Sequence, residues 1–242
     1  ADQAAAAAAS AASNAAAANA GKKRSLEHFM GPGQGQGRNP DSPGGSLALN
    51  SDGTTRGVGT AGRGSFGMGI GLSEGALPAI ADLDLDGTEE VIVGNAMYRP
   101  SGDPLWVDFT QDDGMVSVAN LDDDELGEFV AVSYNTVRAH DTFGAVLWGP
   151  IELETANITS PAAIGDIDAD GLPEIIVSGG NELRAMERDG SIKWTASVTD
   201  ESGATGASIF DFEGDGVSEL VYIDEVEMVV FDGETGAVKF LS

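Results

Sequence analysis

The chain has 242 residues, with 12 Lys and Arg against 40 Asp and Glu, and its formal net charge is -28. This charge repels nucleic acid and anionic membranes, so neither is an expected partner. The absence of cysteine excludes disulfides and thiolate metal sites. No run of about 20 apolar residues occurs, so the sequence predicts no transmembrane segment.

Composition divides the chain into two parts. Residues 1–75 are rich in Ala, Gly, Ser and Asn, and such a composition buries too little apolar surface to fold alone. From residue 76 onward, Val, Ile and Leu clusters alternate with Asp and Gly turns. We therefore expect a long N-terminal assembly tail over residues 1–75, which links subunits, and one compact unit over residues 76–242.

Within the tail, residues 65–72 alternate apolar residues with Gly or Ser. Strict alternation is typical of a strand with one apolar face. Such a strand either closes the chain's own array of sheets or adds to the open sheet edge of a neighbouring molecule. In both cases we expect residues 66–72 to be ordered.

One acidic template occurs four times, and its first ligand-like positions lie 38, 46 and 45 residues apart. An apolar run, a second short run, a Gly-containing turn and a strand with an aromatic residue come after each copy. The four acidic segments are residues 80–90, 118–128, 164–174 and 209–219, and the four aromatics are Trp106, Trp148, Trp194 and Phe240.

Four short antiparallel strands in a unit of about 45 residues are typical of a propeller blade. The sequence thus predicts an all-β fold, a β-propeller-like array of about four four-stranded blades, over residues 76–114, 115–160, 161–205 and 206–242. Because neighbouring blades bury each other's faces, we expect the apolar second residue of each loop to be buried. These residues are Leu83, Leu121, Ile167 and Phe212. A β-sandwich with acidic turns is the alternative, but it does not require the same loop and aromatic four times.

The first acidic loop reads Asp82-x-Asp84-x-Asp86-Gly87-x-x-Glu90. Its alternating carboxylates converge if the chain curls around one point, and Gly at position 6 permits the positive φ that this curling needs. Oxygen ligands without His or Cys favour Ca²⁺. We expect the side chains at positions 1, 3, 5 and 9 and the backbone carbonyl at position 7 to be ligands. The candidate ligands are Asp82, Asp84, Asp86, Thr88 and Glu90; Asn120, Asp122, Asp124, Leu126 and Glu128; Asp166, Asp168, Asp170, Leu172 and Glu174; and Asp211, Glu213, Asp215, Val217 and Glu219.

The four loops are not equivalent, and we expect two to four Ca²⁺ ions per chain. The first and third loops are complete, whereas the fourth has the longer Glu213 at position 3. The second has neutral Asn120 at position 1 and Glu125 in place of Gly, and is predicted to be the weakest. An EF-hand is a poor alternative, because it needs Glu at position 12 and flanking helices. Solvated Asp/Gly turns without metal are the simpler interpretation, which four copies in register make less favourable.

These loops and their flanks resemble the FG-GAP/VCBS-type repeats of integrin α-subunit propellers and many bacterial surface proteins, over about residues 76–242. The resemblance implies an extracellular or cell-surface propeller with a calcium ion in each loop, and roles in adhesion, ligand binding or surface architecture. Propellers of this kind commonly have about seven blades. With four visible repeats, either four blades close into a ring or the chain is an arc that other chains complete.

The leading functional hypothesis is a structural subunit of an extracellular assembly, such as a filament, formed as a homo-oligomer through residues 1–75. The alternative is an extracellular adhesin or a carbohydrate-binding propeller module with a glycan ligand. An enzyme is not expected, because the only histidines are His28, in the tail, and His140, which we interpret as structural.

Overall fold

The computed structural model describes residues 47–49, 55–58, 77–133, 135–153, 160–179, 181–200, 205–224 and 226–242. All regular structure in these residues is β-strand, and none of them belongs to a helix with the length and hydropathy of a membrane span. Sixteen of the strands form four antiparallel four-stranded sheets, so the predicted all-β fold is confirmed.

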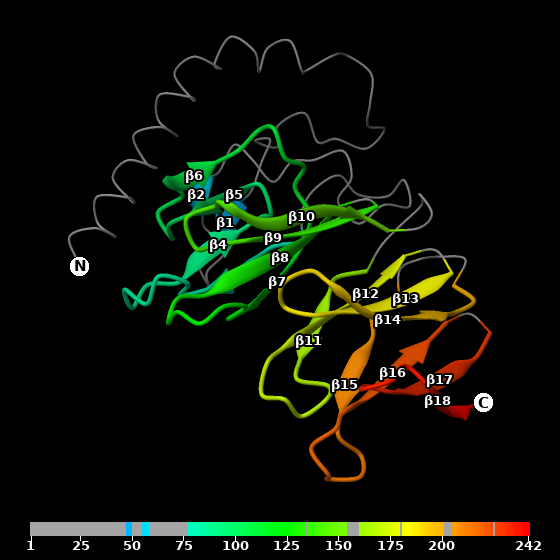
Figure 1. Ribbon diagram of the computed structural model, residues 1–242. Helices are drawn as coiled ribbons and strands as arrows, with labels where there is room; N and C mark the ends of the chain where they lie inside the picture. The colour runs from blue at the N-terminus through cyan, green and yellow to red at the C-terminus, as the bar shows by residue number, and fades with distance from the viewer. Residues whose placement is uncertain are drawn as a thin grey trace, which may run out of the picture.

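Each sheet is a meander in which strands consecutive in sequence are hydrogen-bonded neighbours. In Figure 1 the sheets succeed one another from cyan-green to red along the chain. The first comprises β3 (Ala79–Ala81), β4 (Glu90–Ile92), β5 (Ala96–Tyr98) and β6 (Pro104–Val107); the second β7 (Met115–Ala119), β8 (Glu128–Ser133), β9 (Thr136–His140) and β10 (Val146–Glu152); the third β11 (Ala163–Gly165), β12 (Glu174–Gly179), β13 (Glu182–Met186) and β14 (Ile192–Ser197); and the fourth β15 (Ser208–Phe210), β16 (Glu219–Ile223), β17 (Met228–Asp232) and β18 (Val238–Leu241).

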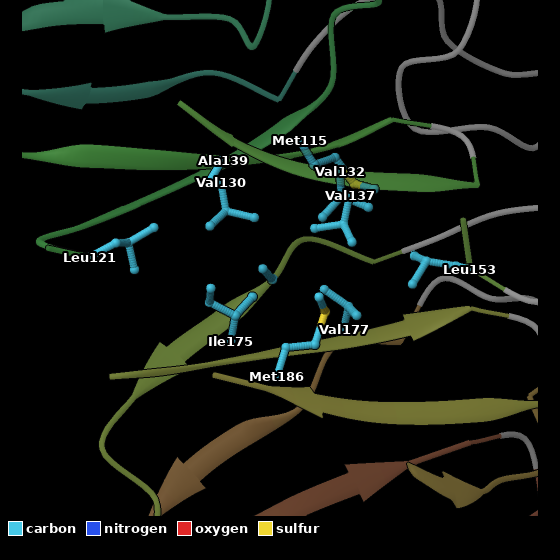
Figure 2. Close-up of a cluster of buried hydrophobic side chains, with 11 residues drawn as sticks. Met115, Leu121, Val130, Val132, Val137, Ala139, Leu153, Ile175, Val177 and Met186 are labelled. Atoms are coloured by element: carbon cyan, nitrogen blue, oxygen red, sulfur yellow. The ribbon is translucent and has the colours of Figure 1, made fainter. Parts of the chain in front are cut away.

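The sheets pack face to face in sequence order, and the first strands of consecutive sheets contact one another. Because both faces of an inner sheet are covered, its second strand is apolar at successive positions rather than at alternate ones. In β12, Ile175 and Val177 face the second sheet, whereas Ile176 lies in the cluster with the fourth. Figure 2 shows the first of these clusters, where Leu121 and Val130 lie opposite Ile175 and Met186.

An aromatic residue on the last strand of each of the first three sheets covers a glycine turn of the next sheet. The Nε1 atoms of Trp148 and Trp194 donate hydrogen bonds to the carbonyls of Arg188 (2.9 Å) and Gly233 (2.7 Å). Trp106 stacks on Phe129 of the second sheet, with ring centroids 5.9 Å apart. These tryptophans therefore pack consecutive sheets against one another.

One part of the packing prediction is wrong. At position 2 of the first three loops, Leu83, Leu121 and Ile167 are at most 4% exposed. At the same position of the fourth loop, Phe212 is 58% exposed. Phe240, the aromatic of the fourth sheet, is 49% exposed. The first three residues are covered by the next sheet along the chain, and the described residues include no sheet beyond the fourth to cover Phe212.

The structure also contains a hairpin, within the predicted tail, that was not predicted from the sequence. β1 (Leu47–Leu49) pairs with β2 (Thr55–Val58) in a separate antiparallel sheet. The signal was Asp52-Gly53, a common hairpin dipeptide, between two short runs. The strand predicted over residues 66–72 and the rest of the tail lie outside the described residues.

Candidate metal centres in the acidic loops

Each acidic loop connects the first and second strands of its sheet. Its ninth residue is a glutamate that begins the second strand and is at most 2% exposed. One carboxylate oxygen of each glutamate, Oε2, accepts a hydrogen bond from the backbone N–H of the second loop residue, at 2.6 to 3.1 Å. The pairs are Glu90 with Leu83, Glu128 with Leu121, Glu174 with Ile167 and Glu219 with Phe212. These bonds tie the start of the loop to the sheet.

The first residue of the first, third and fourth loops organises the curl. Its Oδ2 accepts a hydrogen bond of 2.9 Å from the N–H at position 6 in all three loops. The backbone has positive φ at positions 4 and 6, for example 65° at Ala169 and 87° at Gly171. Glycine at position 6 fits this conformation without a Cβ clash, as expected from the sequence.

The second loop takes another path. Among the described residues, only Leu85 and Ala169 are non-glycine residues with positive φ, so Asp123 and Glu125 do not adopt this curl. The Nδ2 of Asn120 donates to the backbone carbonyl of Asp124 at 2.7 Å. Asn120 thus closes its own loop by donating an amide hydrogen bond.

Three of the loops gather acidic side chains that could hold a metal ion. In each group, one oxygen per residue lies within 4.8 Å of the others. The groups are Asp82, Asp84 and Asp86; Asp122, Asp124 and Glu128; and Asp166, Asp168 and Glu174. The remaining candidates in these loops lie nearby in sequence but outside the groups: Glu90, Asn120 and Asp170. In the fourth loop, Asp211, Glu213, Asp215 and Glu219 form no such group among the described residues.

Two carboxylate oxygens in these groups are buried without a donor. Within the described part of the chain, Oδ1 of Asp82 and Oε1 of Glu174 accept no hydrogen bond. A buried acceptor without a partner costs free energy. The arrangement therefore fits a cation, which would contact these oxygens in the first and third loops.

The pKa values of the glutamates at position 9 of the first three loops are raised by their burial beside the other acids. Burial raises the pKa of Glu174 to about 7 and that of Glu90 to about 6, and neighbouring carboxylates add to both shifts. Burial also raises the pKa of Glu128. A cation favours the charged form of such carboxylates.

Two lysines that the sequence analysis did not single out contact the last two loops. Lys193 Nζ lies 2.5 Å from Oδ2 of Asp168 and 2.9 Å from Oε1 of Glu187. Lys239 Nζ lies 2.6 Å from Oε1 of Glu219 and 2.9 Å from Oε1 of Glu213. Each lysine directly precedes the aromatic residue of its strand, and this recurrence was the available signal.

The candidate backbone ligands at position 7 are held by their own N–H groups. Each donates to Oδ1 of the aspartate at position 5, at 2.7 to 3.1 Å. These residues are Thr88, Leu126, Leu172 and Val217. The role of their carbonyls as ligands stays a prediction.

His140 lies on β9 of the second sheet and is buried beside Trp106 of the first sheet. It is 1% exposed, its Nε2 accepts a hydrogen bond from Nε of Arg138 at 2.9 Å, and it stacks on Phe129 with ring centroids 4.8 Å apart. Burial lowers its pKa to about 4, so the imidazole stays neutral near pH 7. These contacts are those of a packing residue.

Comparison with known proteins agrees with this architecture. A family model described as an FG-GAP-like repeat matches residues 166–222, from the third acidic loop to β16. A search of curated proteins gives no match. Among solved structures, the V. cholerae biofilm matrix protein Bap1 has a TM-score of 0.58 at 15% identity over 70% of this chain and 56% of that one. BBS1N in complex with ARL6DN has a TM-score of 0.52 at 8% identity over 75% and 57%.

The exotype rhamnogalacturonan lyase YesX has a TM-score of 0.49 at 21% identity, and the match covers 68% of this chain and 30% of that one. The chain spans a little over half the length of the first two structures. At 15% and 8% identity, the similarity to the first two structures establishes the fold alone. The family match over residues 166–222 and the repeated loop support an FG-GAP/VCBS-type repeat protein, and the fold is β-propeller-like.

Proposed function

We propose that this chain is an extracellular propeller-type module whose acidic loops bind Ca²⁺, and that it serves as a structural subunit of a surface or matrix assembly. The observation that carries the calcium part is the pair of buried carboxylate oxygens, Oδ1 of Asp82 and Oε1 of Glu174, without a hydrogen-bond donor in the described residues.

The donor set selects the kind of ion. All three acidic groups contain carboxylate oxygens without His or Cys, and hard oxygen donors in a flexible loop suit Ca²⁺. When bound, the ion supplies positive charge that offsets the mutual repulsion of the aspartates. The ninth glutamate belongs both to the loop and to the second strand, so this residue would transmit the stabilisation to the sheet.

The support for an assembly role comes from charge and fold. A net charge of -28 disfavours a compact fold unless cations offset it, and calcium is abundant outside cells. Of the two structures compared above with TM-scores over 0.5, the one with the higher score is a biofilm matrix protein. Linkage of subunits through residues 1–75 rests on the sequence alone.

Two exposed acids of the first loop test the calcium proposal. Asp86 belongs to the acidic group, whereas Glu89 at position 8 lies outside it. We expect Asp86→Asn to lose one bound calcium in isothermal titration calorimetry and Glu89→Gln to lose none. Calcium at 100 times Kd should stabilise the wild type by about 2.7 kcal/mol per site. An identical melting temperature in calcium and in EGTA would refute calcium binding.

A deletion tests the assembly proposal separately. We expect analytical ultracentrifugation to show oligomers for the full chain and monomers for residues 76–242. An unchanged oligomer after deletion would exclude the tail as the link.

One observation favours the alternative, a carbohydrate-binding or adhesive module. Phe210 and Phe212 are 60% and 58% exposed and form an edge-to-face pair with centroids 4.9 Å apart, beside the fourth loop. Exposed aromatic faces suit the apolar faces of sugar rings. A glycan array with the wild type and a Phe210→Ala/Phe212→Ala variant tests it, and binding that the variant retains would exclude this pair.

A further inference from the structure

The fourth acidic loop has the same backbone conformation as the first and third but not the same arrangement of side chains. Its φ is 72° at Gly214 and 96° at Gly216, and Oδ2 of Asp211 accepts the N–H of Gly216 at 2.9 Å. The loop is therefore correctly curled for a metal ion. Its acids nevertheless form no convergent group among the described residues.

The difference lies in the partner of the ninth glutamate. In the third loop, Oε1 of Glu174 has no partner in the described chain. In the fourth loop, the corresponding Oε1 of Glu219 lies 2.6 Å from Nζ of Lys239. The same ammonium group lies 2.9 Å from Oε1 of Glu213, the residue at position 3. The longer Glu213 side chain reaches the lysine, so one cation contacts two of the four candidate side-chain ligands.

From these contacts we infer that Lys239 is the built-in cation of the fourth loop and takes the place of calcium there. Glu219 is 1% exposed, and a buried carboxylate needs a compensating charge. The loop is thus compensated without metal.

The equivalent positions in the other sheets form a series. The residue before the strand aromatic is Leu105 in the first sheet, Leu147 in the second, Lys193 in the third and Lys239 in the fourth. Lys193 shares its charge between Asp168 and Glu187, and Oε1 of Glu174 has no partner in the described residues. Glu187 can therefore retain Lys193 when a metal occupies the third loop. In the fourth sheet the residue equivalent to Glu187 is Asp232, whose Oδ1 already accepts hydrogen bonds from Thr235.

The assignment predicts that the fourth loop can be converted into a calcium site. The variant Lys239→Leu/Glu213→Asp gives it the acids and the leucine of the first loop. Calorimetry with CaCl₂ on the full chain should show one more bound ion for this variant than for the wild type. The opposite change, Leu105→Lys, should remove one ion from the first loop. Arg99→Leu, which removes one exposed positive charge outside the loops, should leave the number unchanged.

A measurement without calcium separates this inference from the proposed function on which its calcium part rests. In EGTA, Lys239→Leu leaves Glu213 and the buried Glu219 without their cation, so the melting temperature should fall by about 4 °C or more, and that of Arg99→Leu should not. Equal melting temperatures for the two variants would overturn the role of Lys239. An unchanged number of ions in the double variant of a chain that does bind calcium would overturn the substitution for metal. If no form binds calcium, the calcium proposal fails and the EGTA comparison alone decides the role of the lysine.

Discussion

Replacing Gly190 by alanine tests whether the tryptophan of one sheet rests on the turn of the next. Gly190 has φ of 85°, and a Cβ there would lie 2.8 Å from Cδ2 of Trp148. Such a Cβ forces either the turn or the indole to move. Gly171 is the matched control, because its φ is 87° and a Cβ there meets nothing within 4 Å.

Both substitutions place alanine at a positive φ, so both strain the backbone. Only the Cβ at position 190 also clashes with Trp148. Alanine at positive φ costs roughly 1–2 kcal/mol, partly offset by a less flexible unfolded chain, so Gly171→Ala should lose about 1 kcal/mol. Overpacking adds about 1–3 kcal/mol, which brings Gly190→Ala to about 3 kcal/mol. Urea denaturation in EGTA, monitored by tryptophan fluorescence, measures both. Equal losses at the two sites would refute the close contact between Trp148 and the turn.

Three further predictions concern buried polar groups. In EGTA and between pH 4.5 and about 7, Glu174 keeps its proton in the folded protein but loses it in the unfolded chain. The free energy of unfolding should therefore fall by about 2 kcal/mol, after allowance for screening, as pH rises through this window. In urea denaturation at a series of pH values, Glu174→Gln should show a smaller fall. Trp194→Phe should cost about 1 kcal/mol more than Trp106→Phe in thermal unfolding. The reason is that Trp194 loses a hydrogen bond, whereas Nε1 of Trp106 has no acceptor in the described residues. Equal costs would contradict this. Arg138→Met should cost about 3 kcal/mol, because Arg138 donates to Ser133 Oγ and to the carbonyls of Gly94 and Asp112. A loss no larger than that of a substitution at the exposed Arg99 would show that this network is dispensable.

The repeat made most of the fold predictable from the sequence. Each acidic loop marks the connection between the first two strands of a sheet, and the aromatics fall on β6, β10, β14 and β18. The apolar runs mark the second strand of each sheet, because an inner strand such as β12 is buried on both faces. Local pattern and tertiary packing agree at these positions, and so one sequence was sufficient.

The features that the sequence did not predict depend on groups distant along the chain. Lys239 is 20 residues beyond Glu219, and only the pairing of the four strands brings the two together. The exposure of Phe212 depends on whether another sheet covers the fourth, which a local motif does not encode. The weakness of the second loop stays a prediction, and the role inferred for Lys239, which contacts two acids of the fourth loop, would add that loop as one without calcium.

The tryptophans give the array three internal reporters. The chain has 3 tryptophans, and each of them lies at a different junction between consecutive sheets. In the described part of the chain, the main contacts between the four sheets join neighbours in sequence, so the stability of the array approximates a sum of sheet and nearest-neighbour terms. Variants that keep one tryptophan each would therefore resolve, junction by junction, whether unfolding starts at one end and spreads or takes place throughout the array at once.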